Sequence, residues 1–213
     1  WLASNVSNSF LREFSVKTIF NGTDLAVFKP SNPSTFIKKY GLDTSKIVLG
    51  VANTWDRRKG LADFIKLRTL LSDRIQIVLV GLNQQQIDNL KTGIIGISRV
   101  ENTGELAAIY SAASVYVNPT YVDNFPTTNI EALACGTPVI TYNTGGSPEA
   151  IDENTGVLVE KGDIKGLVYA IEEILVKGKE FFQIQCRSRA EKMYNKEDRY
   201  IEYLDTYQAL VKK

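Results

Sequence analysis

Two stretches of the chain place charged side chains where an anion could bind. In the first, residues 51–60 read VANTWDRRKG, so Arg57, Arg58 and Lys59 stand just before a helical pattern that begins at Gly60. The N-terminus of a helix carries about half a positive charge and free N–H groups. Cations beside it would suit a phosphate or diphosphate. Taken singly, Arg57 and Arg58 fit a solvated basic loop better, whereas the position of Lys59 at the helix start favours a binding role.

Carboxylates mark the second stretch, residues 118–131, which reads NPTYVDNFPTTNIE. Asp123 lies in a polar loop, and Glu131 follows eight residues later inside a short helical pattern that begins Thr-Thr-Asn. The hydroxyl and N–H groups of that first turn could bind an anion. Glu131 needs a partner, since an unpaired buried charge is costly. The structural alternatives are a salt bridge from Glu131 to an arginine and a turn-forming role for Asp123.

A glycine pair stands in a third polar stretch, residues 142–149, which reads YNTGGSPE. Gly145 and Gly146 permit a positive φ or a close approach of backbone, and Ser147 could cap a short helix with Pro148 at its first position. Alone, such a pair is usually only a turn. The chain contains no GxGxxG and no GxxxxGK[ST] pattern, which counts against a dehydrogenase and against an NTPase.

Composition excludes several further classes of protein. The chain has 213 residues, a net charge of +1 and no histidine, which argues against nucleic-acid binding, triads built on histidine and most catalytic zinc sites. Cys135 and Cys186 form no CxxC pair and fit buried thiols in a reducing compartment. No apolar run reaches the ~18 residues that span a bilayer, and the first residues lack the pattern of a signal peptide. Because the chain does not begin with Met, we expect a piece of a longer protein.

Short apolar runs alternate with helical patterns along the chain. The runs are rich in Val and Ile on consecutive residues, which is typical of strands buried on both faces of a parallel sheet. We predict strands over residues 17–20, 47–53, 75–80, 94–97, 115–118, 138–142 and 156–159. We predict helices over 61–71, 105–113 after a cap at Thr103, 127–134 with caps at its start, about 180–193, 196–211 and from Asp163 onward. The alternation indicates an α/β fold, a doubly wound Rossmann-like parallel sheet flanked by helices, whose ligands bind at the carboxyl ends of the strands.

Five segments in order resemble the donor-binding, C-terminal half of a GT-B glycosyltransferase of family 4, the glycosyl transferases group 1. They are 18–30 (TIFNGTDLAVFKP), 56–60 (DRRKG), 106–119 (LAAIYSAASVYVNP), 123–140 (two acids with seven residues between them, then ALACGTPVI) and 145–149 (GGSPE). The resemblance implies a Rossmann-like nucleotide-sugar-binding domain over 1–195 and a final helix, 196–213, that packs on an N-terminal acceptor domain. We therefore expect the apolar, Tyr-bearing face of that helix, with Tyr194, Tyr200, Tyr203 and Tyr207, to be partly exposed.

The resemblance also implies the roles of the site residues. Glu131 would bind the ribose hydroxyls of the donor, Lys59 the diphosphate, and Asp123 would lie near the transferred sugar; these are the candidate catalytic residues. The candidate donor-binding residues are Asn53, Arg58, Val100, Asn124, Phe125, Thr127, Thr128 and Asn129. Negative charge grows on the departing diphosphate, and one preorganised donor aimed at such charge can be worth ~3–4 kcal/mol. No Asp-x-Asp motif is present, so we expect no metal and no cofactor; the family implies a retaining reaction.

Three positions depart from the family pattern. Asn53 stands where the family usually has Arg, Asp123 where it usually has Glu, and Pro126 where it often has Gly. Arg57 or Arg58 could supply the missing charge. These changes leave open a non-catalytic nucleotide-sugar-binding module, and a sugar-nucleotide epimerase of the same architecture is a further alternative.

The function we expect is sugar transfer from a nucleotide-sugar to an acceptor in synthesis of a bacterial-type surface polysaccharide, such as a capsule, exopolysaccharide or lipopolysaccharide. The expected partners are the nucleotide-sugar and the N-terminal acceptor-binding domain, with no nucleic acid. We expect the isolated piece to be inactive alone. We expect a cytoplasmic location, with contact to the inner face of the membrane only through that other domain.

Overall fold

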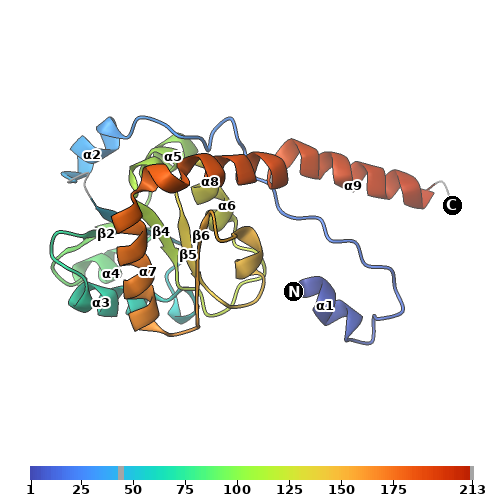
Figure 1. Cartoon of the computed structure of the whole chain (residues 1–213), viewed down its shortest axis with the longest axis horizontal. Helices are drawn as coiled ribbons and strands as arrows, with labels where there is room; N and C mark the ends of the chain where they lie inside the picture. The colour runs from blue at the N-terminus through green and yellow to red at the C-terminus, as the bar shows by residue number, and fades with distance from the viewer. Residues whose placement is uncertain (43–45, 212–213) are drawn as a thin grey trace.

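A parallel sheet forms the centre of the computed structural model, which describes residues 1–42 and 46–211 (Figure 1). Its six strands lie in the order β3-β2-β1-β4-β5-β6, and each pairs in parallel with its neighbours. The strands are β1 (Ile47–Val51), β2 (Gln76–Val80), β3 (Ile94–Ile97), β4 (Val115–Asn118), β5 (Val139–Tyr142) and β6 (Gly156–Val159). This is the doubly wound Rossmann-like order, and it confirms the predicted fold class.

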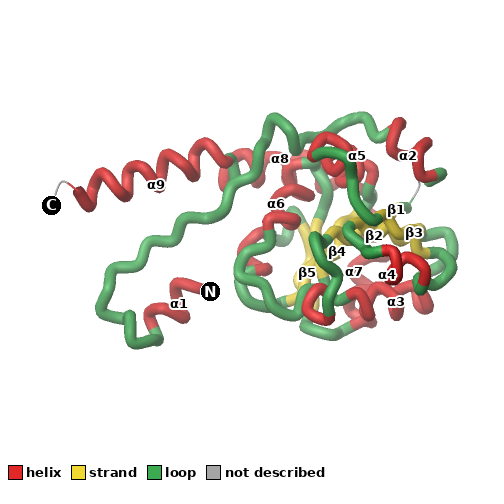
Figure 2. Tube along the Cα trace, turned by 180° about the vertical axis from the view of Figure 1, so that it is seen from behind, coloured by secondary structure: helices red, strands yellow, loops and turns green. Residues whose placement is uncertain are grey.

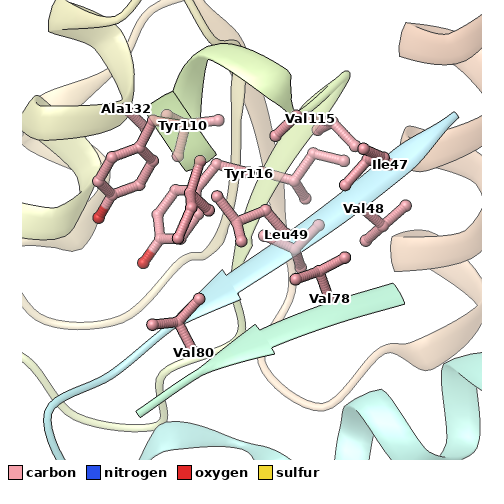
Figure 3. Packing of buried hydrophobic residues seen from close by; sticks show 14 of the residues in the cluster. Ile47, Val48, Leu49, Val78, Val80, Tyr110, Val115, Tyr116 and Ala132 are labelled. Carbon is pink, nitrogen blue, oxygen red and sulfur yellow. The ribbon is translucent and has the colours of Figure 1, made fainter. Parts of the chain in front are cut away.

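Consecutive apolar residues form the strands because both faces of the sheet are covered. Ile47, Val48 and Leu49 of β1 are all buried, and Figure 3 shows their side chains packed among those of the neighbouring strands. Gly50 is needed for close packing, since a Cβ there would lie 2.6 Å from the ring of Phe64 on the helix that follows β1. The hydrophobic core therefore surrounds the two central strands, β1 and β4.

Helices cover the two faces of the sheet in two layers. On one face α3 (Leu61–Leu70) packs against α7 (Ile164–Lys177), and on the other α5 (Thr103–Ala112) and α8 (Lys179–Met193) pack against α6 (Thr127–Ala134) (Figures 1 and 2). The remaining elements are α1 (Leu2–Ser7), α2 (Ser34–Tyr40), α4 (Gln84–Asp88), α9 (Lys196–Val211) and the 3₁₀ turns η1 (Arg57–Lys59) and η2 (Ser147–Ala150).

Two predicted caps differ from the observed ones. Asn102, not Thr103, caps α5, because its side-chain oxygen accepts from the backbone N–H of Glu105 at 2.9 Å. α6 has Pro126 as its N-cap and no side-chain cap. The predicted start of α7 at Asp163 is confirmed, since that carboxylate accepts from Gly166 N–H at 2.9 Å.

The predicted strand over residues 17–20 is wrong. This segment is extended but pairs with no strand, and it leads from the α1 arm back to the domain (Figure 2). Its contacts are with side chains: Lys17 Nζ donates to Thr206 Oγ1 on α9 at 2.8 Å, and Phe20 stacks on Phe125 and Tyr194. The run therefore adopts extended backbone without a sheet edge beside it. The short helices α1, α2 and α4 were not predicted.

The last helix projects away from the domain (Figure 1). Its large apolar and aromatic side chains are exposed, namely Tyr200, Ile201, Tyr203, Leu204, Tyr207, Leu210 and Val211. The expected exposure of this face is confirmed, whereas its packing on an N-terminal domain stays a prediction. Tyr194 was wrongly placed in the stripe: it is buried, and its hydroxyl donates to the carbonyl of Glu149 at 3.0 Å. No helix among the described residues combines the length and apolar character needed to cross a membrane.

Candidate functional site

The candidate site lies where the sheet changes direction. β1 pairs with β2 on one side and with β4 on the other. The chain leaves β1 through α3 on one face and leaves β4 through α6 on the opposite face, so the two loops diverge and open a crevice at the carboxyl ends of the strands. Lys59 is in the loop after β1, and Asp123 is in the loop after β4. The structure therefore brings the first two charged segments together.

Lys59 and Asp123 form an ion pair across this crevice. The Lys59 ammonium nitrogen lies 2.7 Å from Asp123 Oδ2, and the two side chains are only 18% and 14% exposed. Arg58 lies 3.8 Å from the same oxygen and donates to the carbonyl of Val122 at 3.2 Å. Partial burial weakens the screening of this pair relative to an exposed surface pair, which contributes about 0–1 kcal/mol, but the desolvation of both charges offsets that gain. Asp123 is therefore more than a turn residue, and Arg58 is aimed at the site.

Local backbone chemistry fixes the Lys59 loop. Asp56 caps η1, its side chain accepting from the N–H of Lys59 at 3.0 Å. Gly60 then adopts φ +74°, a left-handed conformation that favours glycine. A Cβ on Gly60 would lie 2.3 Å from the carbonyl oxygen of Pro119, so the loops after β1 and β4 are in direct backbone contact.

Gly145 and Gly146, in the loop after β5, pack against the backbone of the loop that carries Asp123. A Cβ on Gly145 would lie 2.0 Å from the carbonyl oxygen of Asp123, and one on Gly146 would lie 1.7 Å from that of Asn124. Gly146 N–H also donates to Asp123 O at 3.1 Å. The close approach of backbone that the glycines permit is thus present. Ser147 does not cap η2; its hydroxyl lies 2.6 Å from that of Thr141.

The first turn of α6 faces the same crevice. With Pro126 at the N-cap, no side chain caps its N–H groups. Thr127 is exposed and Thr128 is partly buried. The helix N-terminus therefore keeps donors and partial positive charge beside Lys59.

Glu131 sits one turn further along α6 in a largely buried position. Its Oε2 accepts a hydrogen bond from the Tyr110 hydroxyl at 3.0 Å. Burial raises the pKa of Glu131, and the Tyr110 hydrogen bond opposes that rise. The salt bridge to an arginine considered above is wrong, because the partner is a tyrosine. Figure 3 shows the hydroxyls of Tyr110 and Tyr116 on the side toward which β1 runs.

The side chain of Asn129 has a structural role, and its predicted part in donor binding stays a prediction. Its side chain is buried, accepts from Asn118 Nδ2 at 2.8 Å and donates to Ser147 Oγ at 3.2 Å. The amide is thus bonded inside the protein, and Asn129 ties α6 to β4 and η2. The ring of Phe125 belongs to an aromatic cluster with Phe20 and Tyr194.

The other predicted donor-binding residues occupy separate places. Asn53 and Asn124 are exposed in the loops after β1 and β4. Val100 is partly buried against the core beyond β3, an edge strand separated from β1 by β2. The structure thus gathers Arg58, Lys59 and Asp123 closely, while Val100 belongs to a more distant loop.

A cavity of about 870 Å³ adjoins the Lys59–Asp123 pair. Arg58, Asp123, Asn124, Phe125 and Glu149 line it on the side of the domain, and the N-terminal segment closes the other side. This volume is in the range of small-molecule sites. Across residues 1–42 and 46–211, no three acidic, cysteine or histidine side chains are grouped to hold a metal ion. The metal-free chemistry expected from the sequence stays a prediction.

Sequence reasoning missed the partners of the site residues. Tyr110 stands inside the segment 106–119 but received no role. Asp63, Tyr121 and Tyr142 form a buried cluster beneath the loops. The sequence did hold one signal for this cluster. Asp63 is an acidic residue four positions before Leu67, and so it falls on the apolar face of the predicted helix.

A sequence match identifies the family to which the chain belongs. Residues 45–177, more than half of the chain, match the family model described as glycosyl transferases group 1, and the chain belongs to this family. The resemblance stated from the sequence is confirmed, and so is the assignment to glycosyltransferases.

Known proteins extend this result. The alpha-maltose-1-phosphate synthase of Mycolicibacterium smegmatis is 28% identical over 161 residues, which cover 68% of this chain and 42% of that protein. Sucrose-phosphate synthase from Thermosynechococcus elongatus superposes with a TM-score of 0.81 at 27% identity, covering 98% of this chain and 56% of that one. HepE from Anabaena, solved in complex with UDP-glucose, shares the fold at a TM-score of 0.78 and 19% identity, covering 91% of this chain and 57% of that one. The chain spans about two fifths of the length of the curated relatives it matches.

Proposed function

We propose that this domain binds the nucleoside diphosphate of a sugar donor at the carboxyl edge of β1 and β4, and that with an N-terminal acceptor domain it transfers the sugar. The observation that carries the proposal is the Lys59–Asp123 pair between the loops after β1 and β4. The start of α6, which no side chain caps, and the partly buried Glu131 follow the second of these loops. The UDP-glucose complex of HepE, which shares the fold, supports a nucleotide-sugar as donor.

Lys59 and α6 would stabilise the diphosphate. A sugar leaving its nucleotide places growing negative charge on the phosphate oxygens, and an ammonium plus free N–H groups fixed beforehand oppose that charge without reorganisation. Arg58 adds a second cation within reach of the same loop. It is a candidate to replace the arginine that the family has where this chain has Asn53.

Glu131 would accept hydrogen bonds from the ribose hydroxyls. Its carboxylate is shielded from water and held by Tyr110, so each added hydroxyl donor makes a charge-assisted bond, typically worth ~1.5–3 kcal/mol. Asp123, which pairs with Lys59, would lie near the transferred sugar. The retaining, metal-independent reaction expected from the family fits this cation-and-dipole site.

The acceptor is the part of the proposal that depends on the rest of the protein. We keep a polysaccharide acceptor as the proposal from the sequence. The names of two proteins similar to this chain, alpha-maltose-1-phosphate synthase and sucrose-phosphate synthase, specify phosphorylated sugars instead. A panel of both acceptor types with the longer protein separates them, and it also separates transfer from a binding-only module or an epimerase.

The test is calorimetric titration of the domain with UDP, GDP and ADP, each with and without Mg²⁺. We expect one nucleotide to bind in the micromolar to low millimolar range without metal. Lys59→Ala and Glu131→Ala should each weaken it at least about tenfold, equivalent to ~1.4 kcal/mol. The controls are Lys91→Ala and Glu172→Ala, which remove the same charges from exposed positions. No nucleotide binding, or equal affinity in both site variants, would overturn the proposal.

A further inference from the structure

A buried carboxylate lies beneath the crevice, on the α3 side of the sheet. Asp63, in the first turn of α3, is 1% exposed. Its Oδ2 accepts a hydrogen bond at 2.9 Å from the hydroxyl of Tyr121 and another at 2.9 Å from that of Tyr142. The nearest cation, Lys66, is 3.5 Å from the other oxygen, and its own side chain is 61% exposed. The two tyrosines are thus the close partners of this acid.

The three residues of this cluster lie in or next to the three loops that build the site. Asp63 follows Lys59 by four residues, Tyr121 precedes Asp123 by two, and Tyr142 ends β5 just before the glycine pair. The rings of Tyr121 and Tyr142 meet edge to face with centroids 5.6 Å apart. One carboxylate oxygen of Asp63 therefore links Tyr121, in the loop after β4, to Tyr142, at the end of β5.

A merely space-filling role would not need this chemistry. A buried acid is costly unless hydrogen-bonded, and apolar residues of similar volume usually pack at least as well. The hydrogen bonds instead fix the position of Tyr121. Its hydroxyl is bonded to Asp63 on α3, and its N–H donates to the carbonyl of Arg58 in η1 at 2.8 Å. Asp123 follows Tyr121 by two residues, so fixing Tyr121 also restricts the position of Asp123.

We propose that Asp63, Tyr121 and Tyr142 form a positioning cluster that sets the Lys59–Asp123 pair and thereby the affinity for the donor diphosphate. The cluster touches no substrate itself. The proposal rests on the proposed function for its effect on affinity, but the positioning of the loop can be measured without any ligand.

The first test is hydrogen exchange on the free domain. Tyr121→Phe and Tyr142→Phe keep the rings and remove one hydroxyl each, so both variants should fold. We expect faster exchange of the amides of Tyr121 and Gly146. The domain should stay folded with its melting temperature lowered by several degrees, because each variant removes one of the two close hydrogen bonds to Asp63. Tyr169→Phe, an exposed tyrosine on α7, is the matched control. Unchanged exchange at both amides would overturn the proposal.

The second test measures affinity for the nucleoside diphosphate that the wild-type domain binds. Tyr121→Phe should weaken it about five- to tenfold, since sub-ångström misplacement of a binding group is enough for such losses. The same change in a Lys59→Ala background should add no further loss. An equal loss in both backgrounds would overturn the proposal, because it would mean that the cluster acts independently of Lys59. Altered exchange in a domain that binds no nucleotide would instead refute only the proposed function.

Discussion

A methyl group at Gly146 should disable the site without unfolding the domain. The Cβ of Gly146→Ala would lie 1.7 Å from the carbonyl oxygen of Asn124, and real Cβ atoms do not approach within 3.0 Å. The loop that carries Asp123 must therefore retreat by about 1.3 Å. That movement pulls Asp123 from Lys59 and shifts the backbone entering α6.

The expected loss follows from the contacts affected. Losing one charge-assisted contact to the diphosphate costs ~1.5–3 kcal/mol, so affinity should fall roughly 10- to 100-fold by calorimetric titration. Overpacking should lower the free energy of unfolding by about 1–3 kcal/mol. Gly104→Ala in α5 is the control: its nearest atom is the Asn102 side-chain oxygen at 3.2 Å, and alanine is favoured inside helices. Wild-type affinity and melting temperature in Gly146→Ala would refute this reading of the loop.

Three further changes test the remaining parts of the structure. Tyr110→Phe removes the hydrogen bond that lowers the pKa of Glu131. As the solution is acidified, this variant should lose nucleotide binding at a higher pH than the wild type does. Binding titrations from pH 5 to 8 that show the same pH dependence for both proteins would contradict this. Glu131→Gln should stabilise the domain at pH 7: burial raises the folded pKa, so the folded state binds more protons than the unfolded one and wild-type stability falls as pH rises through that window. Equal urea midpoints at pH 7 would contradict this. Phe64→Ala, at a fully buried ring, should cost ~3–5 kcal/mol in urea unfolding, and a loss below 1 kcal/mol would place Phe64 outside the core.

Local patterns predicted the sheet well because burial on both faces leaves a strong signal. β4 and the segment 17–20 look alike in sequence, short and partly β-branched. They differ in their surroundings: β4 lies between β1 and β5, whereas Lys17 reaches a side chain on α9. A local sequence pattern does not show which other segment of the chain will lie beside it in the fold. α4 was missed because it has only five residues, although its capping box between Asn83 and Gln86 was a usable signal.

The residues of the site also divide into those that the sequence could predict and those that it could not. Lys59 and Asp123 were predictable as neighbours, because loops after adjacent parallel strands must meet at the edge of the sheet. Tyr110 and Asp63 were not, because they reach the site from helices on opposite faces, and their contacts depend on how each layer packs. The internal hydrogen bonds of the Asn129 side chain were not predicted, because a polar residue in the first turn of a helix can face either the ligand or the core.

The Lys59–Asp123 pair has a consequence for selectivity. The Lys59 ammonium is bonded to an anionic oxygen of the protein's own at 2.7 Å. Under the proposed function, a single phosphate would replace one negative oxygen with another and gain little affinity. A diphosphate would reach the lysine and the α6 N–H groups together, so we expect this pair to favour diphosphates over free phosphate.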